Sequence, residues 1–269
     1  MKIGLDNHLS PYQVAAIRIV SSGIVLFPTA IRFIRQVPSG KLLLVFLSGV
    51  LGSLIPAFLF CIAEEGIDSS LAGTLNALTP IFVIITGTLF FKAIAPVNKI
   101  IGIIIAFAGM VLLLLSKGHI TERQNIIDVM MVVFATILYG FNVNMVSKHL
   151  LGIPSLHLAA VALSFNALPA LGVLYFTGFF HLPFGNKNIL IATGAATVLG
   201  VMGTALATIL FYSLVKRASP IFASMVTYGI PFIAIAWGIY YHETVGWKQL
   251  ASLLVILFGV YWANKKVQM

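Results

Sequence analysis

Residues 69–91 read SSLAGTLNALTPIFVIITGTLFF, and this stretch contains no charged side chain. A helix that crosses the hydrocarbon core of a bilayer needs about 20 mostly apolar residues, and this stretch is long enough in one piece. A membrane-spanning β-strand would alternate apolar and polar residues over about 10 positions, whereas the apolar residues here are continuous. The stretch therefore predicts a transmembrane helix.

Similar apolar runs follow one another along the whole chain. They lie at 11–34, 41–63, 69–91, 97–116, 126–147, 155–178, 188–214, 219–241 and 247–264. The connections between them contain Pro, Gly or charge, and the longest polar stretch, 116–125, is too short for a soluble domain. We therefore predict an all-α integral membrane protein with about nine transmembrane helices.

The bulk composition agrees with a lipid environment. Of the 269 residues, 60% are hydrophobic and 9% are charged, and the mean hydropathy is +1.06. Soluble domains carry about 25% charged residues. The net charge of +9 is spread singly or in pairs between the apolar runs, as in residues that flank a membrane, and it forms no nucleic-acid-binding patch. Cys61 is the only cysteine, so the chain cannot form an internal disulfide.

The distribution of Lys and Arg predicts the orientation in the membrane. If the connection at 34–41 is cytoplasmic, about twice as many basic residues fall in cytoplasmic connections as in outer ones. All Asp and Glu residues then fall outside. We therefore expect a multi-pass protein of the cytoplasmic (inner) membrane with its C-terminus in the cytoplasm.

The two halves of the sequence resemble each other. Without a gap, Ala72 falls on Ala223 and Pro80 falls on Pro231, an offset of 151 residues in both pairs. Proline is costly inside a helix, so the two prolines are the more informative match. We therefore predict two helical repeats of inverted topology.

The predicted repeats cover residues 1–116 and 126–264, with roughly four and five helices. Inverted topology requires an odd number of helices in each repeat. The second repeat opens with the run at 126–147, for which the first repeat shows no counterpart. We therefore expect that one N-terminal helix has been lost, through an incorrect start site, a truncated sequence or natural shortening. The alternative is that the two halves resemble each other by chance.

Several motifs carry a resemblance to a known family. They are SPYQVAAIR at 10–18, SSLAGTLNALTP at 69–80, IFASMVTYGIP at 221–231, and Glu243 before a final helix that contains Gly. The pattern resembles the ten-helix exporters of the drug/metabolite transporter superfamily, of the EamA type. The resemblance implies a secondary carrier that exports amino acids, other small metabolites or amphipathic drugs. Two features depart from the family pattern: its first helix is missing, and Lys92 stands where members often carry Glu.

Motifs of enzymes and of ATP-driven pumps are missing from the sequence. It contains no G-x-x-x-x-G-K-[ST], no H-E-x-x-H and no Cys cluster. We therefore expect no catalytic residues, no metal and no cofactor. No carboxylate falls in the middle of a predicted helix, so a buried proton relay has no support.

The candidate substrate site consists of neutral polar residues near the middles of the helices. Pro80 and Pro231 should break their helices and free backbone carbonyls, which such carriers use as polar sites. Kinks that serve only packing are the alternative. The predicted substrate-binding residues are Asn76, Thr79, Tyr139, Asn142, Thr204, Thr208 and Tyr228. Their neutrality favours an uncharged or zwitterionic substrate, such as an amino acid or an amphipathic drug.

Other polar residues remain open to two interpretations. Arg18 lies about two turns into its helix, where an arginine is costly unless it is paired or reaches the interface. It is either structural or functional. Asn166 and Tyr212 are further candidates for the interior site, although such side chains also join helices to one another.

Other functions were weighed against a carrier of neutral solutes. A nucleotide-sugar or phosphometabolite antiporter would need more basic residues inside the membrane than Arg18. A membrane-embedded enzyme acting on lipid would need a convergent acid, base or metal cluster. A non-transporting truncated remnant is the third alternative. As partners we expect a small-molecule substrate and the lipid bilayer but no nucleic acid, and a homodimer is left open.

Overall fold

The computed structural model describes residues 4–5, 7, 9–116, 126–233 and 246–265. Within these residues the chain forms helices and no β-strand, which confirms the predicted all-α fold. Six of the described helices are long and apolar enough to cross a membrane, and shorter apolar helices lie at Val97–Leu113 and Pro220–Ile233. The described part of the chain thus has the composition of a multi-pass membrane protein.

The helices follow the predicted apolar runs closely. They are α2 (Pro11–Phe33), α3 (Leu42–Gly49), α4 (Ile55–Gly66), α5 (Ser69–Asn76), α6 (Thr79–Phe91), α7 (Val97–Ser116), α8 (Ile126–His149), α9 (Ser155–Phe176), α10 (Lys187–Gly200), α11 (Ala207–Arg217), α12 (Pro220–Ser224) and α14 (Trp247–Asn264). Short 3₁₀ helices lie at Ile34–Gln36, Ser39–Lys41, Phe179–His181 and Met225–Gly229. The rest of the run predicted at 219–241, beyond Ile233, and Glu243 lie outside the described residues.

The start of α2 shows how local sequence sets a helix boundary. The Ser10 hydroxyl accepts a hydrogen bond from the backbone N–H of Gln13, and the Gln13 side chain accepts one from the N–H of Ser10. This reciprocal pair satisfies two backbone donors that a helix start leaves open. Pro11 occupies the first helical position, where its missing N–H has no cost.

Two of the membrane helices contain a segment of π-helix. Val50–Leu54 joins α3 to α4, and Val201–Leu206 joins α10 to α11. The two segments begin 151 residues apart, which is the offset that relates the two halves of the sequence. Segments of π-helix inside α-helices occur frequently at functional sites. They therefore mark one equivalent place in each half.

Helices at equivalent places in the two halves pack antiparallel. In the α2–α9 pair, Gln13 Nε2 donates to the Thr177 carbonyl at 3.0 Å, and the Ser164 hydroxyl donates to the Gly23 carbonyl at 3.2 Å. The contacts move forward along α2 and backward along α9, so the two helices run in opposite directions. Inverted repeats require this arrangement.

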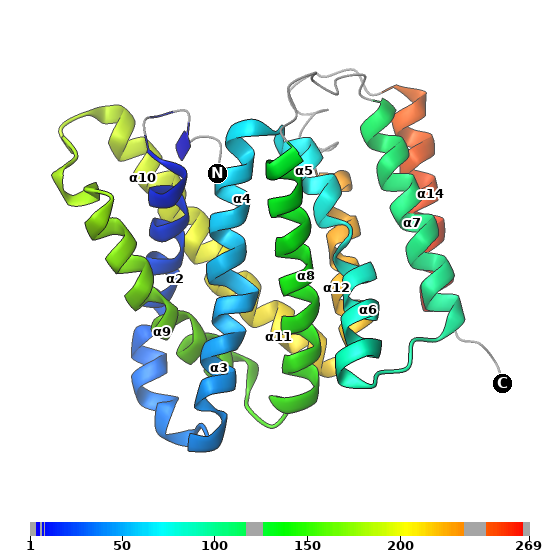
Figure 1. Ribbon diagram of the computed structural model, residues 1–269, viewed down its shortest axis with the longest axis horizontal. Helices are drawn as coiled ribbons and strands as arrows, with labels where there is room; N and C mark the ends of the chain where they lie inside the picture. Colours follow the sequence, from blue (N-terminus) through cyan, green and yellow to red (C-terminus); the bar gives the residue numbers. More distant parts are fainter. Residues whose placement is uncertain (1–3, 6, 8, 117–125, 234–245, 266–269) are drawn as a thin grey trace.

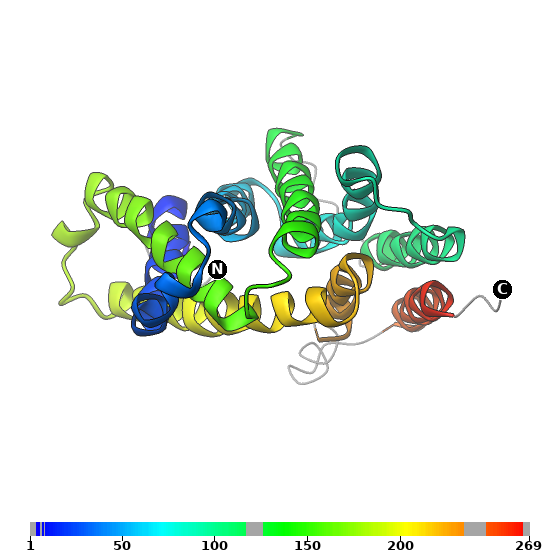
Figure 2. The ribbon, with the colours of Figure 1, turned by 90° about the horizontal axis from the view of Figure 1, so that it is seen from below.

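The α7–α14 pair is also antiparallel and unusually close. A Cβ atom at Gly102 would lie 2.4 Å from the Ala263 nitrogen, and one at Gly109 would lie 2.9 Å from the Ile256 nitrogen. Small residues allow membrane helices to approach each other in this way. Figures 1 and 2 show this pair at one end of the molecule and α2, α9 and α10 at the other, with α4 and α8 between them.

Candidate functional site

The break between α5 and α6 brings three of the predicted residues together. Pro80 has no N–H to donate, and the helix stops at Asn76 and resumes at Thr79. The Thr79 hydroxyl lies 2.7 Å from the Asn76 carbonyl oxygen and 3.3 Å from the Asn76 side-chain oxygen. The carbonyl that the proline leaves without a backbone donor is thus satisfied locally.

The equivalent place in the second half is a 3₁₀ turn, Met225–Gly229, followed by Pro231. Here the Thr227 hydroxyl donates to the Ser224 carbonyl at 3.0 Å. Tyr228 is buried, and its hydroxyl donates to the Ile103 carbonyl of α7 at 3.1 Å. Its phenol is therefore engaged with α7 and does not join the polar residues of α8 in the structure.

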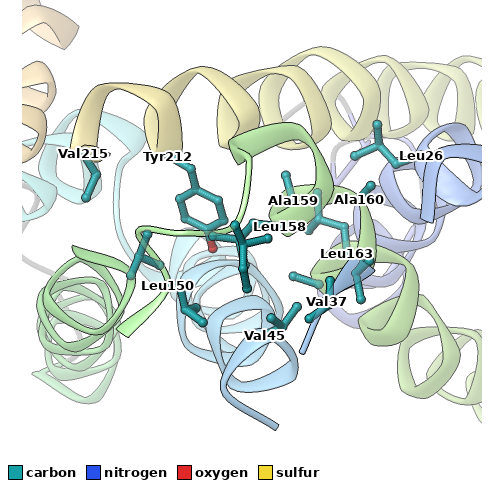
Figure 3. Packing of buried hydrophobic residues seen from close by; sticks show 14 of the residues in the cluster. Leu26, Val37, Val45, Leu150, Leu158, Ala159, Ala160, Leu163, Tyr212 and Val215 are labelled. Atoms are coloured by element: carbon teal, nitrogen blue, oxygen red, sulfur yellow. The ribbon is translucent and has the colours of Figure 1, made fainter. Parts of the chain in front are cut away.

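A polar group links α3, α8 and α11 beside the first π segment. The Tyr212 hydroxyl donates to the Ser48 carbonyl at 3.2 Å and accepts from Asn142 Nδ2 at 3.4 Å. All three residues are buried. Figure 3 shows the Tyr212 ring extending from α11 into a cluster of apolar side chains that includes Val45, Leu150 and Leu158.

Gly52 allows this group to form. A Cβ atom at Gly52 would lie 2.2 Å from Asn142 Nδ2 and 3.2 Å from the Tyr212 hydroxyl oxygen, so no larger residue fits without displacing them. The other amide atom, Asn142 Oδ1, is buried and has no hydrogen-bond partner among the described residues. An unsatisfied buried acceptor is costly and is a place where a ligand donor would be stabilised.

A second polar group surrounds Arg18 at the other π segment. Arg18 Nε donates to the Thr204 hydroxyl at 2.7 Å, and Thr204 is almost fully buried. Tyr139 is half-buried, and its ring stacks at 6.3 Å on Phe60. Arg18 thus joins α2 to the second π segment.

The predicted site residues therefore fall into separate groups. Asn76 and Thr79 form one, Asn142 belongs with Tyr212, and Thr204 belongs with Arg18. Thr208, one turn beyond Thr204, is half-buried. Their role in substrate binding stays a prediction.

The sequence did not predict that the Ser48 carbonyl of α3 accepts the Tyr212 hydroxyl, or that Gly52 of the first π segment makes room for it. Neither Ser48 nor Gly52 was a candidate, although a signal was present. The dipeptide Gly52-Ser53 returns as Gly203-Thr204 at the offset of 151 residues, in the two π segments.

Two other buried asparagines join helices to one another, although Asn166 Oδ1, like Asn142 Oδ1, has no hydrogen-bond partner among the described residues. Asn144 Nδ2 donates to the Val83 carbonyl at 2.8 Å and joins α8 to α6. Asn166 Nδ2 donates to the Phe46 carbonyl at 3.2 Å and joins α9 to α3. Interhelical hydrogen bonds of this kind are the common use of amides in a membrane.

The described residues contain no group of three or more His, Cys, Asp or Glu that could hold a metal ion. Their acidic side chains, Glu64, Glu65, Asp68 and Asp128, lie within three residues of a helix end or in the α4–α5 connection. What the interior offers is a set of hydroxyl, amide and guanidinium groups. Such groups can bind a polar solute reversibly.

A family model and two related proteins match most of the chain. The model of the EamA-like transporter family matches residues 1–115 and 126–265. An uncharacterized transporter of Archaeoglobus fulgidus is 26% identical over 263 residues, which cover 96% of this chain and 90% of that protein. Protein PagO of Salmonella typhimurium is 23% identical over 229 residues, which cover 83% of this chain and 73% of that protein.

A solved crystal structure has the same fold. The superposition gives a TM-score of 0.72 at 14% sequence identity and covers 98% of this chain and 91% of the other.

Proposed function

This chain belongs to the EamA-like transporter family, and from that membership we propose that it is a secondary-active carrier. Its proposed substrates are small neutral or zwitterionic metabolites, such as amino acids, or amphipathic drugs, which it exports by alternating access. The observation that carries the proposal is the pair of polar groups on the two π segments, in a chain that matches the family model in both halves.

The interior polar groups support a solute site. Tyr139 and Asn142 are three residues apart on α8 and share a face of that helix. Tyr139 is half-buried, and Asn142 carries an acceptor without a described partner. We propose that Asn76, Thr79, Tyr139, Asn142, Thr204 and Thr208 line the solute path. Tyr228 would reach the solute path only in a conformation of the transport cycle in which its hydrogen bond to the Ile103 carbonyl is broken.

The broken helices support a carrier mechanism. Such carriers alternate by rocking one repeat against the other around a site of discontinuous helices near the midplane. In this chain α5 and α6 separate before Pro80, and a 3₁₀ turn precedes Pro231. A short break at an equivalent place in the sequence of both halves would let each half bend there without loss of its outer helical turns. We propose residues 1–116 and 126–264 as the two moving repeats.

The topology proposal is a carrier of the cytoplasmic membrane with a cytoplasmic C-terminus. Lys148 Nζ donates to the Phe91 carbonyl at 2.8 Å, and Lys216 Nζ donates to the Ile153 carbonyl. Lys148 thus stabilises the open carbonyl at the C-terminus of α6, whereas Lys216, near the end of α11, binds a carbonyl of the α8–α9 connection. Both lysines lie on the side that the positive-inside rule assigns to the cytoplasm.

The test is uptake and efflux of a labelled metabolite pool in proteoliposomes that contain the purified chain. Alanine variants at the seven predicted residues are compared with Thr88→Ala, whose hydroxyl is exposed and bonds only within its own helix. We expect flux from the wild type and from Thr88→Ala, and reduced flux from most of the seven variants. Unchanged flux in all seven alanine variants would show that these residues do not form the substrate site. No flux from folded wild type would contradict the proposed transport function.

A further inference from the structure

The first π segment leaves two backbone carbonyls without their usual donors. The Ile55 N–H donates to the Val50 carbonyl, whereas in an α-helix it would donate to the Leu51 carbonyl. Pro56 has no N–H, so the Gly52 carbonyl also loses the donor that an α-helix would give it. Two neighbouring carbonyls inside a membrane-spanning helix therefore lack the donors that α-helical geometry supplies.

The second π segment is supplied with donors where the first is not. Ala207 stands at the position equivalent to Pro56, and its N–H donates to the carbonyls of Met202 and Thr204 within the π segment. The Thr204 hydroxyl also accepts a hydrogen bond from Arg18 Nε at 2.7 Å. The second π segment thus has a backbone donor of its own and a cationic side chain from α2.

Alanine takes the place of Arg18 in the other half of the molecule. A Cβ atom at Gly200 would lie 2.5 Å from the Arg18 carbonyl oxygen, and one at Gly49 would lie 2.8 Å from the Ala162 carbonyl oxygen. Gly49 and Gly200 precede the two π segments at equivalent positions, so α9 crosses the first segment as α2 crosses the second. Ala162 is therefore the counterpart of Arg18, and its methyl group brings no charge to the first π segment.

Two buried amides lie against the first π segment. A Cβ atom at Gly52 would lie 2.2 Å from Asn142 Nδ2, and one at Gly49 would lie 2.1 Å from Asn166 Nδ2. The Oδ1 atoms of both asparagines are buried and have no hydrogen-bond partner among the described residues. Asn142 is 3% exposed and Asn166 is 0% exposed. Uncharged oxygens thus gather on the segment whose own carbonyls lack donors.

We propose that the first π segment binds an alkali-metal cation, Na⁺ or K⁺, between Asn142 Oδ1 and the carbonyl oxygens of Leu51 and Gly52. Backbone carbonyls replace the hydration shell of K⁺ in channel filters, and carbonyls of unwound helices coordinate Na⁺ in other carriers. The ligands here are uncharged, which favours a monovalent ion, because Ca²⁺ and Mg²⁺ usually take carboxylates. The ion would bring to the first π segment the positive charge that Arg18 brings to the second.

This inference goes beyond the proposed function, because ion binding can be measured without transport. The assay is thermal unfolding of the purified chain in detergent, in chloride salts of sodium, potassium, methylammonium and N-methyl-D-glucamine at equal ionic strength. We expect at least one of the two alkali-metal cations to raise Tm in a saturable manner above its value in N-methyl-D-glucamine. The rise should be roughly 5–10 °C at about a 100-fold excess over Kd.

Three variants place the ion. Asn142→Leu removes the amide oxygen, so the cation concentration at half of the Tm rise should increase about 10-fold or more, because a ligand of a charged group is lost. Pro56→Ala supplies an N–H for the Gly52 carbonyl and should weaken the affinity without removing a side-chain oxygen. Asn144→Ala is the matched control, because it removes another buried amide of α8. It should lower Tm in every salt and keep the cation-dependent rise.

Every outcome supports or overturns the ion site. Equal Tm values in all four salts would overturn it and leave Asn142 Oδ1 to a bound water. A rise in methylammonium alone would assign the oxygens to the ammonium group of an organic solute and overturn a metal-ion site. A rise that Asn142→Leu and Pro56→Ala both retain would place the ion elsewhere and refute the proposal. If Asn142→Leu does not fold, Pro56→Ala and Asn144→Ala decide. Absence of flux in vesicles would contradict the transport function and leave the binding result standing.

Discussion

A glycine-to-alanine change at Gly52 should disturb the molecule in a way that the same change at Gly203 does not. The two glycines occupy equivalent places in the two π segments. A Cβ atom at Gly52 would lie 2.2 Å from Asn142 Nδ2 and 2.8 Å from Asn142 Cγ. At Gly203, the nearest atom is the end of the Leu199 side chain at 2.8 Å, which belongs to the same span and can rotate away.

The magnitudes follow from these contacts. Forcing a methyl group into a packed interior costs about 1–3 kcal/mol, and displacing Asn142 weakens its bond to Tyr212, worth about 1 kcal/mol. Against this, alanine is favoured over glycine in a helix by about 0.5–1 kcal/mol. We therefore expect Gly52→Ala to lower the free energy of unfolding by about 1–3 kcal/mol. Gly203→Ala should leave it unchanged or raise it slightly.

The assay is thermal unfolding of both purified variants in detergent, followed by uptake in proteoliposomes. For a protein of this size, 1 kcal/mol corresponds to roughly 2–4 °C in Tm. Gly52→Ala should therefore unfold several degrees below Gly203→Ala and transport more slowly. Equal Tm values and equal rates for the two variants would refute the claim that Gly52 makes room for the Asn142–Tyr212 pair.

Three further changes test other contacts. Tyr212→Phe removes the hydroxyl that bonds Ser48 and Asn142, so the free energy of unfolding measured with denaturant should fall by about 1–3 kcal/mol. An unchanged denaturation midpoint would contradict these hydrogen bonds. Asn144→Ala removes the hydrogen bond from α8 to α6 and should lower the free energy of unfolding by about 1–3 kcal/mol. The α6 amides should then be less protected in hydrogen exchange, and wild-type protection would contradict the linking role of Asn144. Pro80→Ala restores a backbone donor in the break and should lower the maximal transport rate without lowering Tm, and an undiminished rate would count against a moving break.

The sequence alone predicted the helices well, because a continuous apolar run of spanning length is a strong local signal. The ends of α2, α9 and α14 lie within two residues of the predicted ends. The prediction of a change in helix geometry near Pro80 rested on a backbone donor that proline lacks. Both inferences need only neighbouring residues.

The π segments and the contacts of Arg18 could not be predicted in this way. Pro56 follows Val50–Leu54 closely, but no proline or charge stands at or directly after Val201–Leu206, so local sequence did not distinguish the two segments from ordinary helix. The bond from Arg18 to Thr204 joins residues 186 positions apart and depends on how two helices pack. For the same reason the sequence grouped Tyr228 with Asn142, while packing directs its hydroxyl to α7.

The most direct test of the carrier proposal is solute counterflow. Proteoliposomes containing the purified chain are loaded with a high concentration of an unlabelled amino acid, and entry of a trace of the labelled one is followed. An alternating-access carrier predicts transient accumulation of label above its outside concentration, and Asn142→Ala should reduce it while Thr88→Ala should not. Label that only equilibrates, with no overshoot in folded wild type, would contradict alternating access as the mechanism.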